Sequence, residues 1–164
     1  MTFYDYLSCV VFILTIAINS LLVYFQKTRQ IYNRFGKRAF LVHSLVLTLV
    51  WGGFIFTEFL TANSSWRFAD KYPGAGLLFL SLGLSMYLLA IKEIGGNAMG
   101  NGYFFGYPLR KLGGIYRFIK EPIYWSYAVW FAGWALFTGQ KVFLLYVIIS
   151  IIGLIGIESR VERP

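Results

Sequence analysis

The sequence has few of the residues that carry chemistry in soluble enzymes. Its 164 residues include one cysteine and one histidine. A single cysteine excludes an intrachain disulfide, and one cysteine with one histidine does not supply the usual ligand set of a zinc site. The chain also lacks a nucleotide P-loop, an HExxH motif and a GxSxG motif. We therefore expect a function that needs no metal ion.

Charged residues are also scarce. They make up 13% of the chain, against 58% hydrophobic residues, whereas about a quarter of a typical soluble domain is charged. The composition predicts a single membrane-embedded domain over residues 1–164, with the lipid bilayer as its surroundings. The net charge of +8 does not indicate a nucleic-acid partner, because the basic residues fall between apolar runs, where they orient the chain and attract anionic headgroups.

Five apolar runs predict membrane helices, and they cover residues 3–25, 40–60, 74–91, 122–137 and 142–157. The first three are long enough to cross a hydrocarbon core of about 30 Å at about 1.5 Å per residue. The last two are short for independent crossings, so we expect them to form a short helical hairpin. The predicted fold is an all-α integral membrane protein with about five transmembrane helices.

The basic residues predict the orientation of the chain. The densest basic loop lies between the first two runs and contains Lys27, Arg29, Arg34, Lys37 and Arg38. Because loops rich in lysine and arginine stay in the cytoplasm, we expect the N-terminus outside and the C-terminus in the cytoplasm. The same rule places residues 95–121 on the cytoplasmic side, since this segment holds Arg110, Lys111, Arg117 and Lys120.

Residues 95–121 are rich in glycine and differ from the apolar runs around them. Gly96 and Gly100, like Gly102 and Gly106, have the GxxxG spacing. This spacing is common where membrane helices pack closely, but glycine also lets a backbone approach a ligand. Neighbouring polar residues are not needed on a pure packing face and favour the ligand interpretation: Asn97, Asn101, Tyr103 and Tyr107.

Glu121 stands directly before Pro122. Proline suits the first turn of a helix because it has no N–H to donate there, so Glu121 is expected at the N-terminus of the helix over 122–137. A carboxylate at this place can cap the helix or accept a proton in a reaction. The surrounding aromatic residues suit either an interfacial belt or the wall of a ligand site; they are Tyr116, Tyr124, Trp125 and Tyr127.

Glu158 and Glu162 lie four residues apart and share a helical face if the last helix continues that far. Their like charges repel unless an arginine or a cationic ligand compensates. A solvated helix end and a site for a cation are both compatible with this pair.

One segment resembles a known family. The run Gly114-Ile-Tyr-Arg-Phe-Ile-Lys-Glu-Pro-Ile-Tyr124 resembles the GxYxxxRHPxY signature of the isoprenylcysteine carboxyl methyltransferase and phospholipid methyltransferase superfamily, with Lys120-Glu121 in place of Arg-His. Glu121-Pro-Ile-Tyr-Trp125 and Gly133-Trp-Ala-Leu136 look most like the NPMYWG and LGWAL segments of phosphatidylethanolamine N-methyltransferases. The run from Gly96 to Gly106 is similar to the GxxxGDYFG segment of that branch.

The resemblance implies a transferase that uses S-adenosylmethionine at the cytoplasmic edge of the helices, with a membrane lipid as substrate. The implied methyl acceptor is the amine of a phosphatidylethanolamine-type lipid, and Glu121 is the candidate catalytic base. By position, the residues implied to contact the cofactor are Gly96, Gly100, Tyr116, Arg117, Glu121, Pro122, Tyr124, Glu158 and Glu162.

Three alternatives keep the membrane setting but change the chemistry. The first is an isoprenylcysteine-type or thiol-type methyltransferase, since the segment over 116–124 is close to that branch too. The second is a sterol-reductase-like enzyme that uses NADPH. The third is a scaffold of helices without enzymatic activity. The sequence leaves the methyl acceptor and the oligomeric state open.

Overall fold

A computed structural model describes residues 1–29, 38–61, 66–95 and 113–161 of the chain. These parts are helical and contain no strand apart from an isolated bridge between Arg67 and Gln140. The elements in order are α1 (Phe3–Arg29), α2 (Arg38–Thr61), α3 (Pro73–Ile94), the 3-10 helix η3 (Gly114–Arg117), α5 (Pro122–Thr138), α6 (Val142–Ile149), the π-helix η4 (Ser150–Glu158) and α7 (Ser159–Val161). The predicted all-α class is confirmed.

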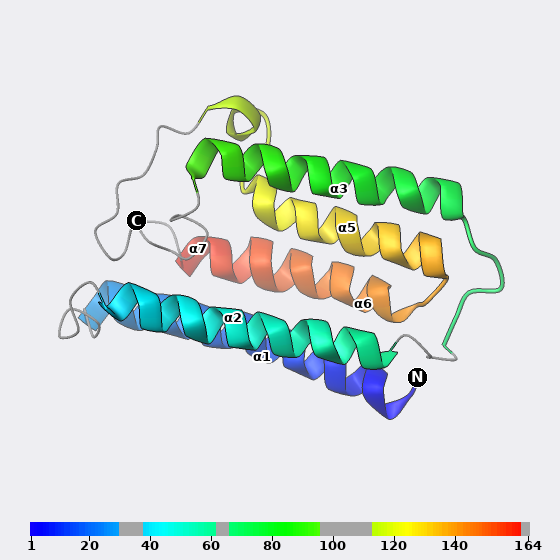
Figure 1. Cartoon of the computed structure of the whole chain (residues 1–164), viewed down its shortest axis with the longest axis horizontal. Helices are drawn as coiled ribbons and strands as arrows, with labels where there is room; N and C mark the ends of the chain where they lie inside the picture. Colours follow the sequence, from blue (N-terminus) through cyan, green and yellow to red (C-terminus); the bar gives the residue numbers. More distant parts are fainter. Residues whose placement is uncertain (30–37, 62–65, 96–112, 162–164) are drawn as a thin grey trace.

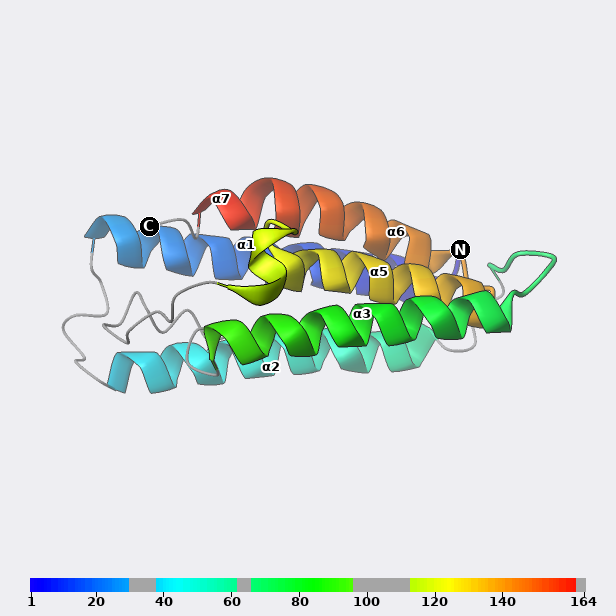
Figure 2. The same cartoon turned by 90° about the horizontal axis from the view of Figure 1, so that it is seen from above.

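The long helices lie side by side along one axis (Figures 1 and 2). α1, α3 and the continuous helix α6–η4–α7 run in one direction, while α2 and α5 run in the other. α3 packs along α5, and α1 lies between α2 and the C-terminal helix. As a result, one end of the bundle contains the end of α3, the 3-10 helix η3, the start of α5 and the end of α7. This end carries the candidate site.

Glycine allows α3 and α5 to approach closely. A Cβ atom placed on Gly76 would lie 2.6 Å from the backbone nitrogen of Phe137, and one on Gly133 would lie 2.8 Å from the backbone nitrogen of Leu80. Small residues at such contacts are the usual means by which membrane helices pack, because lipid tails supply no hydrophobic drive between helices. These contacts hold the start of α3 against the end of α5.

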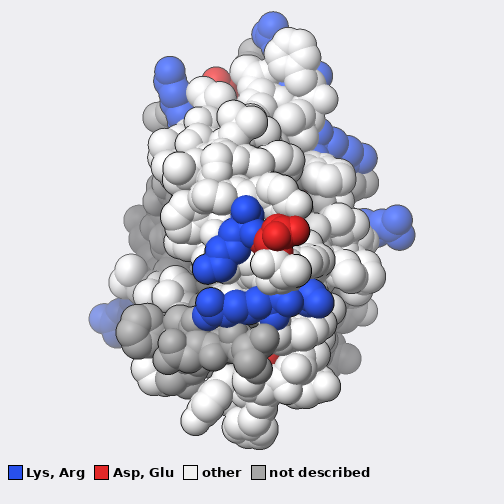
Figure 3. All heavy atoms as spheres, turned by 90° about the vertical axis from the view of Figure 1, so that its right-hand side faces the viewer, with Lys and Arg blue, Asp and Glu red and all other residues white. Residues whose placement is uncertain are grey.

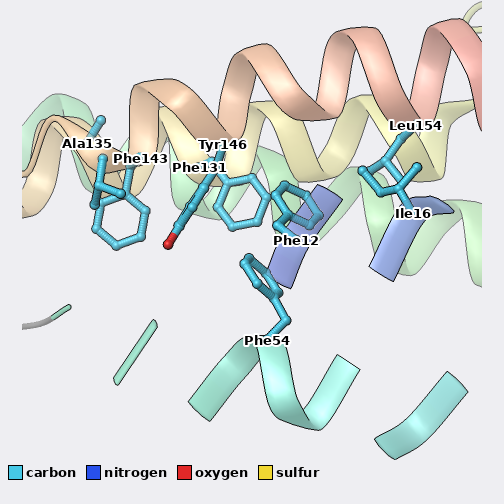
Figure 4. Packing of buried hydrophobic residues seen from close by; sticks show 9 residues of the cluster. Phe12, Ile16, Phe54, Phe131, Ala135, Phe143, Tyr146 and Leu154 are labelled. Atoms are coloured by element: carbon cyan, nitrogen blue, oxygen red, sulfur yellow. The ribbon is translucent and has the colours of Figure 1, made fainter. Parts of the chain in front are cut away.

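Aromatic side chains form the core that joins the two halves of the chain (Figure 4). The ring of Phe12 on α1 stacks on Phe54 of α2 with centroids 4.4 Å apart. Its edges meet Phe131 of α5 at 5.6 Å and Tyr146 of α6 at 5.7 Å. Such pairs add about 0.5–1.5 kcal/mol each beyond the area they bury. One residue of α1 therefore ties together helices from both ends of the sequence.

The C-terminal helix is longer than the sequence predicts. An apolar run ending at residue 157 was expected, but the helix continues without interruption from Val142 to Val161 and includes the π-helical η4. α5 has 17 residues and forms a hairpin with it across the turn at Gly139, whose φ of 75° is a left-handed C-cap. The second arm of the hairpin is thus a full-length helix.

Four helical segments are long and apolar enough to cross a membrane: Phe3–Gln26, Arg38–Phe56, Pro73–Ile94 and Val142–Val161. Large apolar side chains on their outer faces are exposed, as expected where lipid replaces water; on α2 these include Leu41, Leu45 and Leu49. The chain is an integral membrane protein. Because α5 is shorter than these four, the fifth crossing stays a prediction.

The opposite end of the bundle is closed by the connection that precedes α3. This segment pairs with the α5–α6 turn through backbone hydrogen bonds from Phe68 to Gly139 and from Lys141 to Trp66, of 2.8 and 3.0 Å. Figure 3 faces this end and shows a few basic side chains beside an acidic group on a largely uncharged surface. The exposed charged residues described here are Arg67, Asp70 and Lys71.

Candidate functional site

Three glutamates lie at the end of the bundle where α3, η3 and α7 meet. Glu93 belongs to the last turn of α3, Glu121 directly precedes α5, and Glu158 ends η4. Figure 1 places these parts of the chain at the same end of the molecule. Because these carboxylates come from three separate elements, the fold rather than any local motif brings them to one region.

Glu93 lies against the backbone of Gly113 and Gly114, at the start of η3. A Cβ atom on Gly114 would lie 2.5 Å from the Oε1 atom of Glu93, and one on Gly113 would lie 3.3 Å from its Oε2 atom. Gly114 also has a φ of 48°, a conformation that side chains disfavour. Only glycine at position 114 leaves room for the carboxylate. The backbone at the start of the segment from Gly114 to Tyr124 therefore packs closely against Glu93.

Tyr116 in η3 faces two of the glutamates. Burial raises the pKa of its hydroxyl to about 12, and the negative charges of Glu121 and Glu93 add to the effect. Each of these influences disfavours a second anion in the same place. The phenol therefore remains protonated at neutral pH and can donate a hydrogen bond within an acidic site.

Glu121 holds a strained backbone conformation. Its φ of 57° and ψ of 54° are left-handed, and it is the non-glycine residue with positive φ in the described part of the chain. Its side chain makes no capping hydrogen bond to α5; its carbonyl oxygen accepts bonds from the backbone nitrogens of Tyr124 and Trp125. Glu121 is thus the N-cap residue of α5, as predicted, but it caps the helix through its backbone and not through its side chain. Strain of this kind is often found at functional sites.

Glu158 is buried inside the bundle rather than solvated at a helix end, with 4% of its surface exposed. Asn19 of α1 donates a hydrogen bond from Nδ2 to its Oε1 atom. On another side, Glu158 interacts electrostatically with the hydroxyl of Tyr127 in α5, which shares a side-chain hydrogen bond with Tyr87 of α3. A buried carboxylate needs such partners, because desolvating an isolated charge costs several kcal/mol.

A groove of about 840 Å³ lies between α2, α3 and α5. Tyr127 and Tyr87 line it, and the ring of Tyr127 stacks on Trp51 of α2 at 5.5 Å. The rest of the lining is mostly apolar and includes Gly52, Leu84 and Phe131. Tyr127, which lines the groove, also interacts electrostatically with the buried Glu158 carboxylate.

The remaining predicted site residues fall into two groups. Pro122 is buried at the first turn of α5, Tyr124 packs against the aromatic core, and Arg117 is exposed. Gly96, Gly100 and Glu162 lie outside the described residues, as does most of the predicted cofactor segment over 95–121. Trp125 is 39% exposed, which suits the aromatic belt.

Sequence reasoning missed three residues of this region: Asn19, Tyr87 and Glu93. Asn19 carries a visible signal, since an amide in the middle of an apolar run needs a hydrogen-bonding partner in lipid. Glu93 also carries a visible signal, because this charged residue stands at the end of an apolar run. In the part of the chain that the structure describes, no group of three or more histidine, cysteine, aspartate or glutamate residues is arranged to hold a metal ion.

One comparison with known proteins identifies a family. A family model described as phospholipid methyltransferase matches residues 73–164, which is more than half of the chain. No curated protein and no solved structure matches the chain. The matched region runs from the first residue of α3 to the C-terminus and includes Glu93, Glu121 and Glu158. The resemblance seen in the sequence is confirmed, and the chain belongs to the phospholipid methyltransferase family.

Proposed function

We propose that this protein transfers a methyl group from S-adenosylmethionine to the amine of a phosphatidylethanolamine-type lipid. The observation that carries the proposal is the family match over residues 73–164, which contains all three carboxylates of the candidate site. A cationic cofactor and a cationic headgroup both suit a region rich in carboxylates and aromatic rings.

The donor set fits the cofactor. When bound, S-adenosylmethionine supplies an electrophilic methyl group on a positively charged sulfur. The glycine backbone at Gly113 and Gly114 lies against the Glu93 carboxylate, and the protonated hydroxyl of Tyr116 would donate a hydrogen bond to the cofactor nearby. Glu158, which accepts a hydrogen bond from Asn19, would bind the α-ammonium group of the cofactor. Burial of this carboxylate strengthens its attraction for a cation, since a low dielectric screens charge less.

Glu121 is the proposed proton acceptor. A lipid amine is mostly protonated at neutral pH, as lysine is, and it must lose a proton before it can attack the methyl group. Its side chain makes no capping hydrogen bond to α5. In this proposal the carboxylate takes a proton from the headgroup, either directly or through water.

The groove between α2, α3 and α5 is the proposed place of the lipid acyl chains. Its apolar lining and its volume of about 840 Å³ suit a chain, and one of its lining residues, Tyr127, interacts electrostatically with Glu158. α2 packs mainly on α1 and forms one wall of this groove opposite α3 and α5. A lipid could thus enter sideways from the bilayer.

We infer that the carboxylate end faces the cytoplasm. Exposed basic residues lie at this end: Arg38, Lys92, Arg117, Lys120 and Arg160. Together with the predicted basic loop between α1 and α2, they support the orientation given by the positive-inside rule.

A transfer assay tests the function. The purified protein is placed in nanodiscs that contain phosphatidylethanolamine and is incubated with methyl-labelled S-adenosylmethionine. Label in methylated phosphatidylethanolamine supports the proposal. Label in a thioether or a carboxyl ester, when thiols or prenylated cysteine are offered instead, assigns the thiol or isoprenylcysteine alternative. Thermal stabilisation by NADPH but not by S-adenosylmethionine assigns the reductase alternative, and no response to either cofactor assigns a scaffold.

Substitutions at two neighbouring glycines of α2 test whether the groove holds the lipid. No atom lies within 4 Å of a Cβ placed on Gly52 or on Gly53, but only Gly52 lines the groove. Gly52→Leu should lower kcat/KM for the lipid about tenfold by filling it, with the affinity for S-adenosylmethionine unchanged. Gly53→Leu is the matched control and should change neither. Equal effects of the two variants would remove the groove from the lipid path.

A further inference from the structure

The first helix carries an unusual row of buried polar side chains. α1 buries Asp5, Ser8, Thr15, Asn19, Ser20 and Gln26. Two of them form hydrogen bonds to the C-terminal helix. The hydroxyl of Tyr146 donates to the Oγ atom of Ser8 at 2.5 Å, and Asn19 donates to Glu158. Both bonds are buried and join the same two helices, but only one of them ends on a carboxylate of the candidate site.

The π-helix explains why Glu158 faces α1. Residues four apart in an α-helix are offset by about 40° beyond a full turn, so twelve residues accumulate about 120°. A π-helix holds more residues per turn and reverses this drift. Tyr146, Ser150, Leu154 and Glu158 are accordingly all buried, at 0%, 0%, 0% and 4% exposure. Without η4, the carboxylate would turn away from Asn19.

The partner of Glu158 is a neutral amide. An N–H donor on one carboxylate oxygen favours the ionised form and fixes the rotation of the group. A lysine or arginine in its place would do the same but would cancel the negative charge. Asn19 is 5% exposed, so this bond is shielded from competing water. The bond from Asn19 orients the carboxylate and does not itself neutralise the negative charge.

We propose that Asn19 is a positioning residue, which holds the Glu158 carboxylate in the orientation that binds the cationic end of S-adenosylmethionine. This inference rests on the proposed function. It also extends the site beyond residues 73–164, because Asn19 belongs to a helix that the family model does not cover. In this proposal α1 contributes a residue to the cofactor site and also anchors the chain in the membrane.

The test compares two variants of the full chain in nanodiscs. Asn19→Leu removes the donor to Glu158 at similar size, and Ser8→Ala removes the other buried bond between the same helices. For each variant, the dissociation constant of S-adenosylmethionine and the unfolding temperature are measured. Asn19→Leu should raise the dissociation constant about tenfold. Ser8→Ala should lower the unfolding temperature but leave the dissociation constant within about twofold of the wild-type value.

Two further variants separate positioning from folding. Asn19→Gln keeps an amide donor and should restore most of the affinity lost in Asn19→Leu, which also provides a measurement if the leucine variant does not fold. In a Glu158→Gln background, replacing Asn19 by leucine should have little further effect on the dissociation constant, because residues that act through one contact are not additive.

The outcomes distinguish the two proposals. If the wild-type protein binds no S-adenosylmethionine, the proposed function fails, and the role of Asn19 fails with it. If the wild-type protein binds the cofactor but Asn19→Leu and Ser8→Ala change its affinity equally, only the role of Asn19 is overturned. Additive effects of the Asn19 and Glu158 substitutions would overturn it as well.

Discussion

The backbone of Glu121 allows stability and activity to be separated at a single position. With φ at 57° and ψ at 54°, Glu121 occupies a conformation that costs a residue with a Cβ atom about 1–2 kcal/mol. Glycine does not bear this cost, but it loses about 0.5–1 kcal/mol more conformational entropy on folding. Glu121→Gly should therefore raise the free energy of unfolding by about 0.5–1 kcal/mol.

Alanine and glutamine are the controls for this change. Glu121→Ala removes the carboxylate but keeps the Cβ atom, so any difference between the glycine and alanine variants reports the backbone alone. Glu121→Gln keeps the shape of the side chain without its charge. All three variants should lower the turnover number much more than they lower cofactor affinity, because the proposed role of Glu121 is to accept a proton.

The measurements are unfolding temperature and steady-state kinetics in the same detergent. For a chain of this length, a gain of about 0.5–1 kcal/mol should raise the unfolding temperature of the glycine variant by roughly 1–4 °C relative to the alanine variant. If glycine is no more stable than alanine, the strain argument is refuted. If Glu121→Gln loses affinity and turnover in equal measure, Glu121 binds the cofactor and is not the base.

Two further predictions concern stability. Because the pKa of Tyr116 is raised to about 12 above an ordinary value near 10, the hydroxyl stabilises the fold below pH 10, and this contribution is lost as the pH rises from about 10 to 12. Tyr116→Phe should make alkaline unfolding less steep in that window; an unchanged pH profile would contradict the shift. Gly133→Ala should lower the free energy of unfolding by about 1–3 kcal/mol, since its Cβ atom would lie 2.8 Å from the backbone nitrogen of Leu80. Gly74→Ala, with no atom within 4 Å, should instead be neutral or raise it by up to about 1 kcal/mol, and equal losses in both variants would argue against close packing of α3 on α5.

The helices could be predicted where local residues set their ends. Proline stands at the first position of α3 and of α5, and glycine with positive φ follows both, at Gly95 and Gly139. These residues act through their own backbone conformations, so the sequence reveals them directly. The predicted boundaries of these helices accordingly lie within a few residues of the observed ones.

The end of the last helix could not be predicted in the same way. A glutamate after a long apolar run indicates a helix leaving the membrane, so the sequence placed the boundary before Glu158. In the structure, Asn19 and the π-helical turn bury this residue. The two residues of that bond are 139 positions apart, and no local pattern reports such a contact.

The residues of the candidate site also divide into those that a local motif identifies and those that only tertiary packing reveals. Glu121 and Tyr116 were found because a contiguous motif contains them, whereas Glu93 and Asn19 enter through packing between separate helices. The left-handed conformation of Glu121 is also hidden from the sequence, since an aligned glutamate before proline looks like an ordinary helix cap. A motif can name the segment of a site, but the partners of its side chains depend on the tertiary fold.

The central claim is that Glu158 binds S-adenosylmethionine at this end of the bundle, and an equilibrium binding isotherm tests it most directly. The wild-type protein and Glu158→Gln, both in nanodiscs, are titrated with labelled S-adenosylmethionine. We expect saturable binding by the wild-type protein and a dissociation constant at least about tenfold higher for the variant, since glutamine keeps the shape of the side chain but not its charge. Absence of saturable binding by the wild-type protein, or equal affinity in the two proteins, would contradict this assignment.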